Sequence, residues 1–146
     1  MKLVDANVLL YAVNERSAHH RVARAWLDAA LSGRETVGFA WIVVLAFLRL
    51  GTHPAVFPRP LEPEDAVVVV EEWLAQPPAI VVDPTARHLE VLGGLLAAVG
   101  TAGNLVNDAH LAALAVEQDA EIISFDTDFS RFPGVRSHPP TEPTGG

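Results

Sequence analysis

The sequence contains no cysteine, which excludes disulfide bonds, thiolate chemistry and cysteine-based zinc sites. It has a single lysine, Lys2. Acid-rich phosphohydrolases and receiver domains usually need a lysine late in the chain, so both classes fit this sequence poorly. No apolar run reaches the roughly 18 residues needed to span a bilayer, and the longest, residues 37–48, stops at Arg49. An acid at position 5 does not suit a signal-peptide core. We therefore expect a cytoplasmic protein.

Charge and hydrophobicity narrow the function further. The chain has 146 residues, the size of one domain with a substantial core. Its formal net charge of −8 argues against a protein that holds nucleic acid by a broad basic surface. The same charge suits clustered carboxylates that hold a divalent cation. Half of the residues are hydrophobic, so we expect a partner or a second copy to cover some apolar surface.

Short apolar segments alternate with longer segments of helical spacing. The predicted strands are residues 2–5, 36–39, 79–82 and 121–124, with a last short strand around Val135. Predicted helices begin near Asn7 and cover residues 18–31, 41–50, 63–76, 85–99 and 105–118, with Ser17 as a candidate N-cap. This alternation predicts one α/β domain over residues 1–136, an α/β/α sandwich around a mostly parallel sheet of four to five strands. Residues 137–146, rich in Pro, Thr and Gly, are predicted to form a flexible tail.

Acidic residues follow the predicted strands. Asp5 closes the first strand, and Asp126 and Asp128 follow the strand at residues 121–124. Asp108 falls in the first turn of the helix before that strand. Sites of open parallel sheets form beyond the carboxyl ends of the strands, so these acids can meet there. Oxygen ligands of this kind suit Mg²⁺ or Mn²⁺ and the hydrolysis of a phosphodiester.

Each of these residues also has a purely structural interpretation. Asp5 can cap the helix that follows it, and Asp128 can serve as a cap or turn residue rather than a ligand. Asn7 is open to the same capping role. Asn104 either shares a helical face with Asp108 or caps that helix.

Three segments together resemble the PIN-domain family, and in particular its VapC-type toxins of type II toxin–antitoxin systems. Residues 4–7 (VDAN) are similar to the opening D-x-N motif, residues 103–112 (GNLVNDAHLA) to the later motif, and residues 123–129 (ISFDTDF) to the closing T-x-D-x-D-F motif. The resemblance covers residues 1–136. It implies Asp5, Asp108 and Asp126 as catalytic metal ligands, with Asp128 as a further candidate. Asn7, Asn104 and Ser124, which stands where the family has Thr, would support them.

The resemblance has one departure. PIN domains generally carry a glutamate in the helix after the second strand, and the matching position here is Ala46. The expected four-acid site is thereby reduced to three acids. Asp128, Asp83 or additional water on the ion could replace the missing ligand.

Other polar residues remain candidates with open roles. Arg49 and Arg131 are candidate RNA contacts, although Arg49 could also pair with a site carboxylate or lie along the surface. For His110 we expect packing or solvation rather than catalysis, and for His19 and His20 a solvated face rather than a metal site.

Two functions follow from the resemblance. The first is a Mg²⁺- or Mn²⁺-dependent endoribonuclease, the toxin of a toxin–antitoxin pair, which would act on RNA, bind a cognate antitoxin and form a homodimer. The second is a degenerate PIN fold that binds RNA or protein without catalysis, for which Ala46 is the main support.

Overall fold

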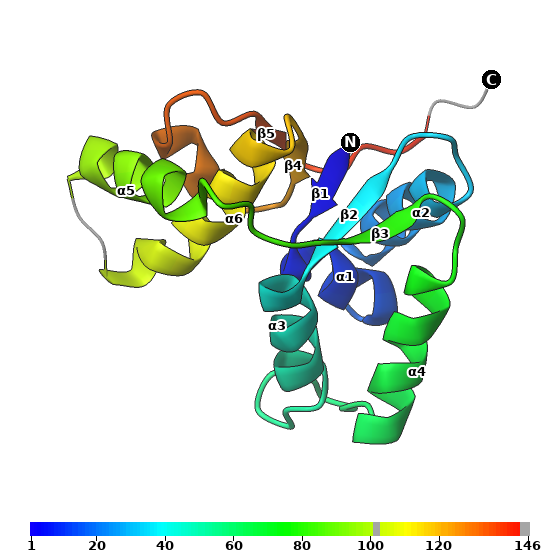
Figure 1. The fold of residues 1–146 in the computed structure, drawn as a ribbon. Helices are drawn as coiled ribbons and strands as arrows, with labels where there is room; N and C mark the ends of the chain where they lie inside the picture. Colours follow the sequence, from blue (N-terminus) through cyan, green and yellow to red (C-terminus); the bar gives the residue numbers. More distant parts are fainter. Residues whose placement is uncertain (101–102, 144–146) are drawn as a thin grey trace.

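The computed structural model describes residues 1–100 and 103–143, in which strands and helices alternate along the chain (Figure 1). The strands are β1 (Lys2–Val4), β2 (Val37–Ala40), β3 (Ala79–Val82), β4 (Glu121–Ile123) and β5 (Ser137–His138). The α-helices are α1 (Ala6–Val13), α2 (His20–Leu31), α3 (Trp41–Gly51), α4 (Pro63–Leu74), α5 (His88–Val99) and α6 (Val106–Glu117). Two short 3₁₀ helices, η1 (Gly103–Leu105) and η2 (Thr127–Arg131), adjoin α6 and β4.

The sheet is parallel throughout, and its strand order reverses once. The order is β3-β2-β1-β4-β5, so the chain moves outward from β1 to β3 and then crosses back to β4. Because such crossovers are right-handed, the reversal separates α1–α4 from α5 and α6. In Figure 1, α5 and α6 lie to the left of the sheet, and α1–α4 lie to its right and below. The predicted α/β architecture around a mostly parallel sheet of four to five strands is confirmed, and the sheet has five.

The reversal also fixes the place of a site. β1 and β4 are neighbours in the sheet although the chain enters β4 only after crossing over β1 and β2. The crevice beyond the carboxyl ends of two such strands is where open α/β sheets bind ligands. Asp5 directly follows β1, and Asp126 lies three residues after β4 ends. The topology therefore brings two of the candidate acids to one edge.

The central strands are apolar because helices cover both faces of the sheet. Fully buried side chains come from β1, β2 and β4 and include Leu3, Val4, Phe39, Ile122 and Ile123. Burial of each such side chain contributes about 1.5–3 kcal/mol to stability. β3, at the edge, leaves Ile80 and Val81 exposed.

Two predicted helices begin two or three residues later than expected. The helix predicted from residue 18 begins at His20, and Ser17 is not its N-cap: the Ser17 hydroxyl accepts from the His19 amide in the preceding turn, 3.0 Å away. The helix predicted from residue 85 begins at His88, because the Thr85 amide donates to Glu117 of α6 at 2.9 Å instead of entering a helix. In both places a hydrogen bond from the backbone to a side chain, local at Ser17 and long-range at Thr85, competes with the helix.

The last strand lies two residues beyond Val135. Ser137 and His138 form β5 and pair with Ile122 and Ile123, so the sheet takes up the first two residues of the predicted tail. Further along, Glu142 forms an ion pair with Arg21 at 3.2 Å. Flexibility of the tail stays a prediction, and residues 144–146 lie outside the described residues.

Across residues 1–100 and 103–143, no helix has both the length and the apolar character that crossing a membrane requires.

Candidate metal centre

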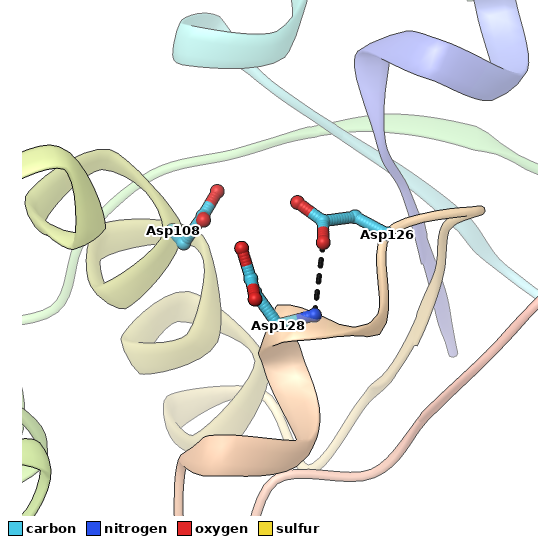
Figure 2. Close-up of side chains that lie close together, drawn as sticks. All are labelled: Asp108, Asp126 and Asp128. Atoms are coloured by element: carbon cyan, nitrogen blue, oxygen red, sulfur yellow. Dashed lines mark hydrogen bonds between the residues drawn. The ribbon is translucent and has the colours of Figure 1, made fainter.

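Three carboxylates converge beyond the carboxyl end of β4. Figure 2 shows Asp108 reaching from α6 toward Asp126 and Asp128, which belong to the turn that opens η2. One carboxylate oxygen from each of the three lies within 4.8 Å of the others. All three side chains are partly exposed, so an ion can reach them from solvent. Three oxygen donors at this spacing suit a hard divalent cation.

The backbone of η2 sets the positions of Asp126 and Asp128. Asp126 has extended backbone angles and is the N-cap of η2, where its Oδ1 accepts from the Asp128 amide at 2.8 Å. This bond brings Asp128 round beside Asp126, as the dashed line in Figure 2 shows. The Asp126 carboxylate thus has one oxygen engaged as a cap and the other free of that bond.

The charges of the group repel one another. Burial, and after it the neighbouring carboxylates of Asp126, Asp5 and Asp128, together raise the pKa of Asp108 to about 6. In the described part of the chain the one ion pair made by Asp108, Asp126 or Asp128 joins Arg131 Nε to Asp128 Oδ1 at 3.7 Å. A cluster of like charges with so little compensation is the arrangement that a cation would stabilise.

Asp5 lies beside this group and is held by its own hydrogen bonds. Its Oδ1 accepts from the Ala6 amide at 2.7 Å and caps α1, so the structural interpretation of Asp5 as an N-cap is confirmed. Its Oδ2 accepts from the Ser124 hydroxyl at 2.7 Å. Burial, which outweighs these hydrogen bonds, raises the pKa of Asp5, and the charge of Asp126 adds to that rise. Asp5 is not one of the three acids within 4.8 Å of one another.

Ser124 connects Asp5, Asn7 and Asp126. Its hydroxyl donates to Asp5 and accepts from Asn7 Nδ2 and from the Asp126 amide, each at 3.0 Å. A hydroxyl offers one donor and two acceptor positions, and all three are used here. Asn7 Oδ1 in turn accepts from the Phe125 amide at 3.1 Å, which fixes the orientation of the Asn7 side chain. Ser124 is buried, so this network is shielded from water.

A hollow of about 320 Å³ opens between α3 and this acidic edge. Asp5 and Asp108 line it from one side, and Ala46 and Arg49 of α3 line it from the other. Ala46 therefore occupies the wall of the site, where its methyl group leaves space that a longer side chain would fill. Arg49, one turn further along α3, is exposed and forms no ion pair within the described residues.

Other predicted residues take different places. Asn104 lies exposed in η1 and does not cap α6, whose N-cap is Leu105. Asp83 follows β3 and belongs neither to the acidic group nor to the lining of the hollow. Asn107, which precedes Asp108 in the chain, lines the hollow.

Sequence reasoning missed a chain of polar contacts between α5 and α6. His88 Nδ1 contacts the Glu117 carboxylate, and His88 Nε2 lies 2.9 Å from His110 Nδ1. The Glu117 side chain is only 3% exposed, and hydrogen bonds from Thr85 and His88 lower its pKa against the opposing effect of burial. Burial and the neighbouring His88 lower the pKa of His110. The residues are 22 to 32 positions apart, and no local pattern connects them.

The comparison with known families gives a match that spans every element of the fold except the last strand, β5. The model of the PIN domain matches residues 2–135. The chain belongs to the PIN-domain family. The PIN domain here is 60% identical over 136 residues to Ribonuclease VapC37 of Mycobacterium tuberculosis, with 93% of this chain and 94% of that protein covered. It is 41% identical over 136 residues to Ribonuclease VapC33 of the same species, with 93% and 95% covered.

Solved PIN-domain structures share the fold at lower identity. A structure of VapBC2 from Rickettsia felis bound to a promoter DNA fragment matches with a TM-score of 0.68 and 21% identity, over 94% of this chain and 97% of that one. A structure of M. tuberculosis VapC20, described as a toxin that cleaves the sarcin-ricin loop, matches with a TM-score of 0.67 and 21% identity, over 93% and 99%. At this identity the likeness shows the fold of the PIN domain alone.

Proposed function

We propose that this protein is a metal-dependent endoribonuclease that acts as the toxin of a toxin–antitoxin pair. The observation that carries the proposal is the convergence of Asp108, Asp126 and Asp128 at the reversal point of the sheet, with Asp5 anchored beside them. Relatives at 60% and 41% identity carry the name ribonuclease VapC, which supports the same activity for this chain. Their names also support RNA as the substrate class.

The carboxylates fit a divalent cation, and Mg²⁺ or Mn²⁺ suits their oxygen-only donor set. Asp108 and Asp126 would hold the ion together with Asp128, and Asp5 would face it from the wall of the hollow. A bound ion would lower the pKa of a water molecule and neutralise charge that develops on the phosphate oxygens. Water in the remaining positions is compatible with Mg²⁺, which retains several of its own waters in protein sites.

Other residues would orient the carboxylates and the RNA. Ser124 and Asn7 hold one oxygen of Asp5 and leave the carboxylate little freedom to rotate. Arg49 lines the same hollow as Asp5 and Asp108, where its guanidinium can reach a phosphate of the substrate. Arg131, paired with Asp128 at 3.7 Å, would exchange that carboxylate for RNA phosphate when the ion binds.

The experiment is cleavage of total RNA by the purified, antitoxin-free protein. The reaction is run with Mg²⁺, with Mn²⁺ and with EDTA, for the wild type and for Asp108→Asn, Asp126→Asn and Asp128→Asn. Asp83→Asn is the matched control, because it removes an exposed carboxylate outside the site. We expect discrete metal-dependent cleavage that is lost in the three site variants and retained in the control. Cleavage that persists in EDTA or in Asp108→Asn would refute the proposal.

One observation favours a second function. Ala46 lines the hollow at the position where the family resemblance expects a glutamate, which supports a degenerate site that binds RNA or protein without cutting. The variant Ala46→Glu separates the two functions. If the wild type cuts no RNA and the Ala46→Glu variant does, the site has lost its activity with the glutamate. An active wild type would show that the glutamate is dispensable here.

An antitoxin and a second copy of the chain are the proposed protein partners. Trp41 and Leu45 lie one turn apart on α3 and are 54% and 59% exposed, which supports a covering partner on that helix. Structures of related fold were solved as VapBC assemblies, which supports an antitoxin.

A further inference from the structure

A cluster of three rings lies beside the acidic group and has no part in the site described above. Tyr11 of α1, His19 before α2 and Phe125 after β4 contact one another pairwise, with ring centroids 4.5 to 5.2 Å apart. We call these three residues the aromatic platform. His19 and Phe125 are the closest pair, with centroids 4.5 Å apart and ring planes 35° apart.

The backbone ties the platform to the acidic site. Phe125 stands between Ser124 and Asp126, and its amide donates to Asn7 Oδ1 at 3.1 Å. The ring of Phe125 packs against α1 through its contact with Tyr11. Tyr11 lies one helical turn after Asn7 on the same face of α1, and its ring meets Phe125 edge-on at 5.2 Å. The platform and the acidic group therefore share the short segment from Ser124 to Asp126.

His19 is the exposed member of the platform, and its position is fixed. Tyr11 and Phe125 are half-buried against the core, whereas His19 is exposed. The Ser17 hydroxyl accepts from the His19 amide at 3.0 Å, and His20 Nδ1 lies 2.9 Å from the Tyr11 carbonyl, so the turn is held at both ends. An exposed aromatic ring whose backbone is held in this way is the kind of surface on which an unpaired nucleobase stacks.

From this geometry we propose that the aromatic platform stacks an unpaired base of the RNA next to the scissile phosphate and so contributes to substrate selection. The inference rests on the proposed ribonuclease function, because RNA is the ligand of the platform only if RNA is the substrate of this protein. The position favours RNA over an apolar peptide because Phe125 of the platform immediately precedes Asp126, one of the carboxylates that suit a phosphate-bound cation, and Arg16 is exposed in the same loop as His19. Stacking selects single-stranded segments, because paired bases hide their faces.

The first test is binding, which is independent of cleavage. The probe is an oligouridine with one 2-aminopurine, whose fluorescence is quenched when the base stacks. We expect the wild-type protein with Mg²⁺ to quench it, His19→Ala to weaken binding at least roughly fivefold, and His19→Phe to restore it, since base stacking spans about that effect or more per aromatic ring. His53→Ala, which removes an exposed histidine from the α3–α4 loop, is the matched control.

The second test is cleavage of total RNA by the same four proteins, with KM and kcat determined on one mapped cleavage product. The platform predicts a raised KM with little change in kcat for His19→Ala and recovery in His19→Phe. If quenching depends on His19 but the protein cuts no RNA, the proposed ribonuclease activity is refuted and base stacking on the platform is supported. If cleavage and quenching are both unchanged in His19→Ala, the proposed base stacking is refuted and the ribonuclease activity is supported. Absence of quenching by the wild type would also overturn it.

Discussion

The substitution Asp108→Asn is expected to stabilise the metal-free protein while it abolishes the metal site. The pKa of Asp108 is raised from its usual 3.8 to about 6 by burial and by three neighbouring carboxylates. A carboxyl group whose pKa is raised in the folded state favours folding when it is protonated. Its contribution is complete below about pH 4, the unfolded value, and is lost as the pH rises through about 6. At neutral pH the ionised Asp108 therefore opposes folding.

The size of this effect follows from the shift. About two pKa units at 1.36 kcal/mol each give an upper bound of about 3 kcal/mol. Asp108 is partly exposed, and screening by solvent reduces the cost to about 1–2 kcal/mol. Asparagine is nearly isosteric and carries no charge, so Asp108→Asn should recover that amount. For a domain of this size, this corresponds to a rise in Tm of about 2–8 °C.

The assay is urea unfolding of protein freed of metal on a chelating resin, at a series of pH values between about 4 and 7. The free energies of Asp108→Asn and wild type should agree near pH 4 and separate toward pH 7, with the variant more stable. Added Mg²⁺ should stabilise the wild type, by about 2.7 kcal/mol at one hundred times Kd, and leave the variant unchanged. Asp83→Asn should show neither effect. A difference that is absent at pH 7, or that does not vary with pH, would refute the electrostatic account of this site.

Two further predictions concern the contacts that surround the site. Ser124→Ala removes the shorter of the two hydrogen bonds to Asp5 Oδ2 and leaves Asn7 Nδ2 and the Asp126 amide without the hydroxyl that accepts from them. We therefore expect a loss of about 1–3 kcal/mol in unfolding free energy and of most activity. Ser124→Thr, which keeps the hydroxyl, should retain both, and equal behaviour of the two variants would contradict this. Glu117→Gln should lower stability by about 1–3 kcal/mol, as measured by urea unfolding, because it weakens the link to His88. Because the pKa of Glu117 is lowered in the folded protein, its carboxylate contributes to the free energy of unfolding above pH 4.5, the usual pKa, and this contribution is lost as the pH falls through the folded-state pKa. A destabilisation by Glu117→Gln that grows toward acid pH would contradict the assignment.

The fold could be predicted because its signals are local. Residues 2–4, 37–40 and 121–123 are short apolar runs, and the helices between them have apolar spacing, so alternation alone gives a parallel sheet. The element ends were less certain where side chains from distant segments compete for backbone groups. Thr85 shows this: its amide binds Glu117, 32 residues away, and the helix begins three residues later than its local sequence suggests.

The site could be predicted in outline and not in detail. The positions of Asp5, Asp108 and Asp126 after strands or at a helix start place them at one edge of the sheet. Their distances depend on how η2 turns, and that turn brings Asp128 into the group while Asp5 is held by Ser124. The aromatic platform and the contact of His88 with Glu117 join segments far apart in the chain. No spacing in the sequence signals either of them.

The absence of a carboxylate at position 46 bears on how the remaining acids work. A glutamate there would line the same hollow as Asp5 and Asp108 and add another negative charge to a group that already raises the pKa of Asp108 to about 6. More protons would then compete with the ion at neutral pH, although each added carboxylate also strengthens its attraction. With Ala46, the three close acids need less neutralisation, which a divalent cation that keeps its own waters would supply. The space beside Ala46 also leaves Arg49 without a carboxylate partner on its own helix face, so its charge stays available for an RNA phosphate. A site with Ala46 in place of a glutamate is therefore compatible with activity. Fewer carboxylates repel one another around the cation, and Arg49 is available to neutralise a phosphate of the substrate.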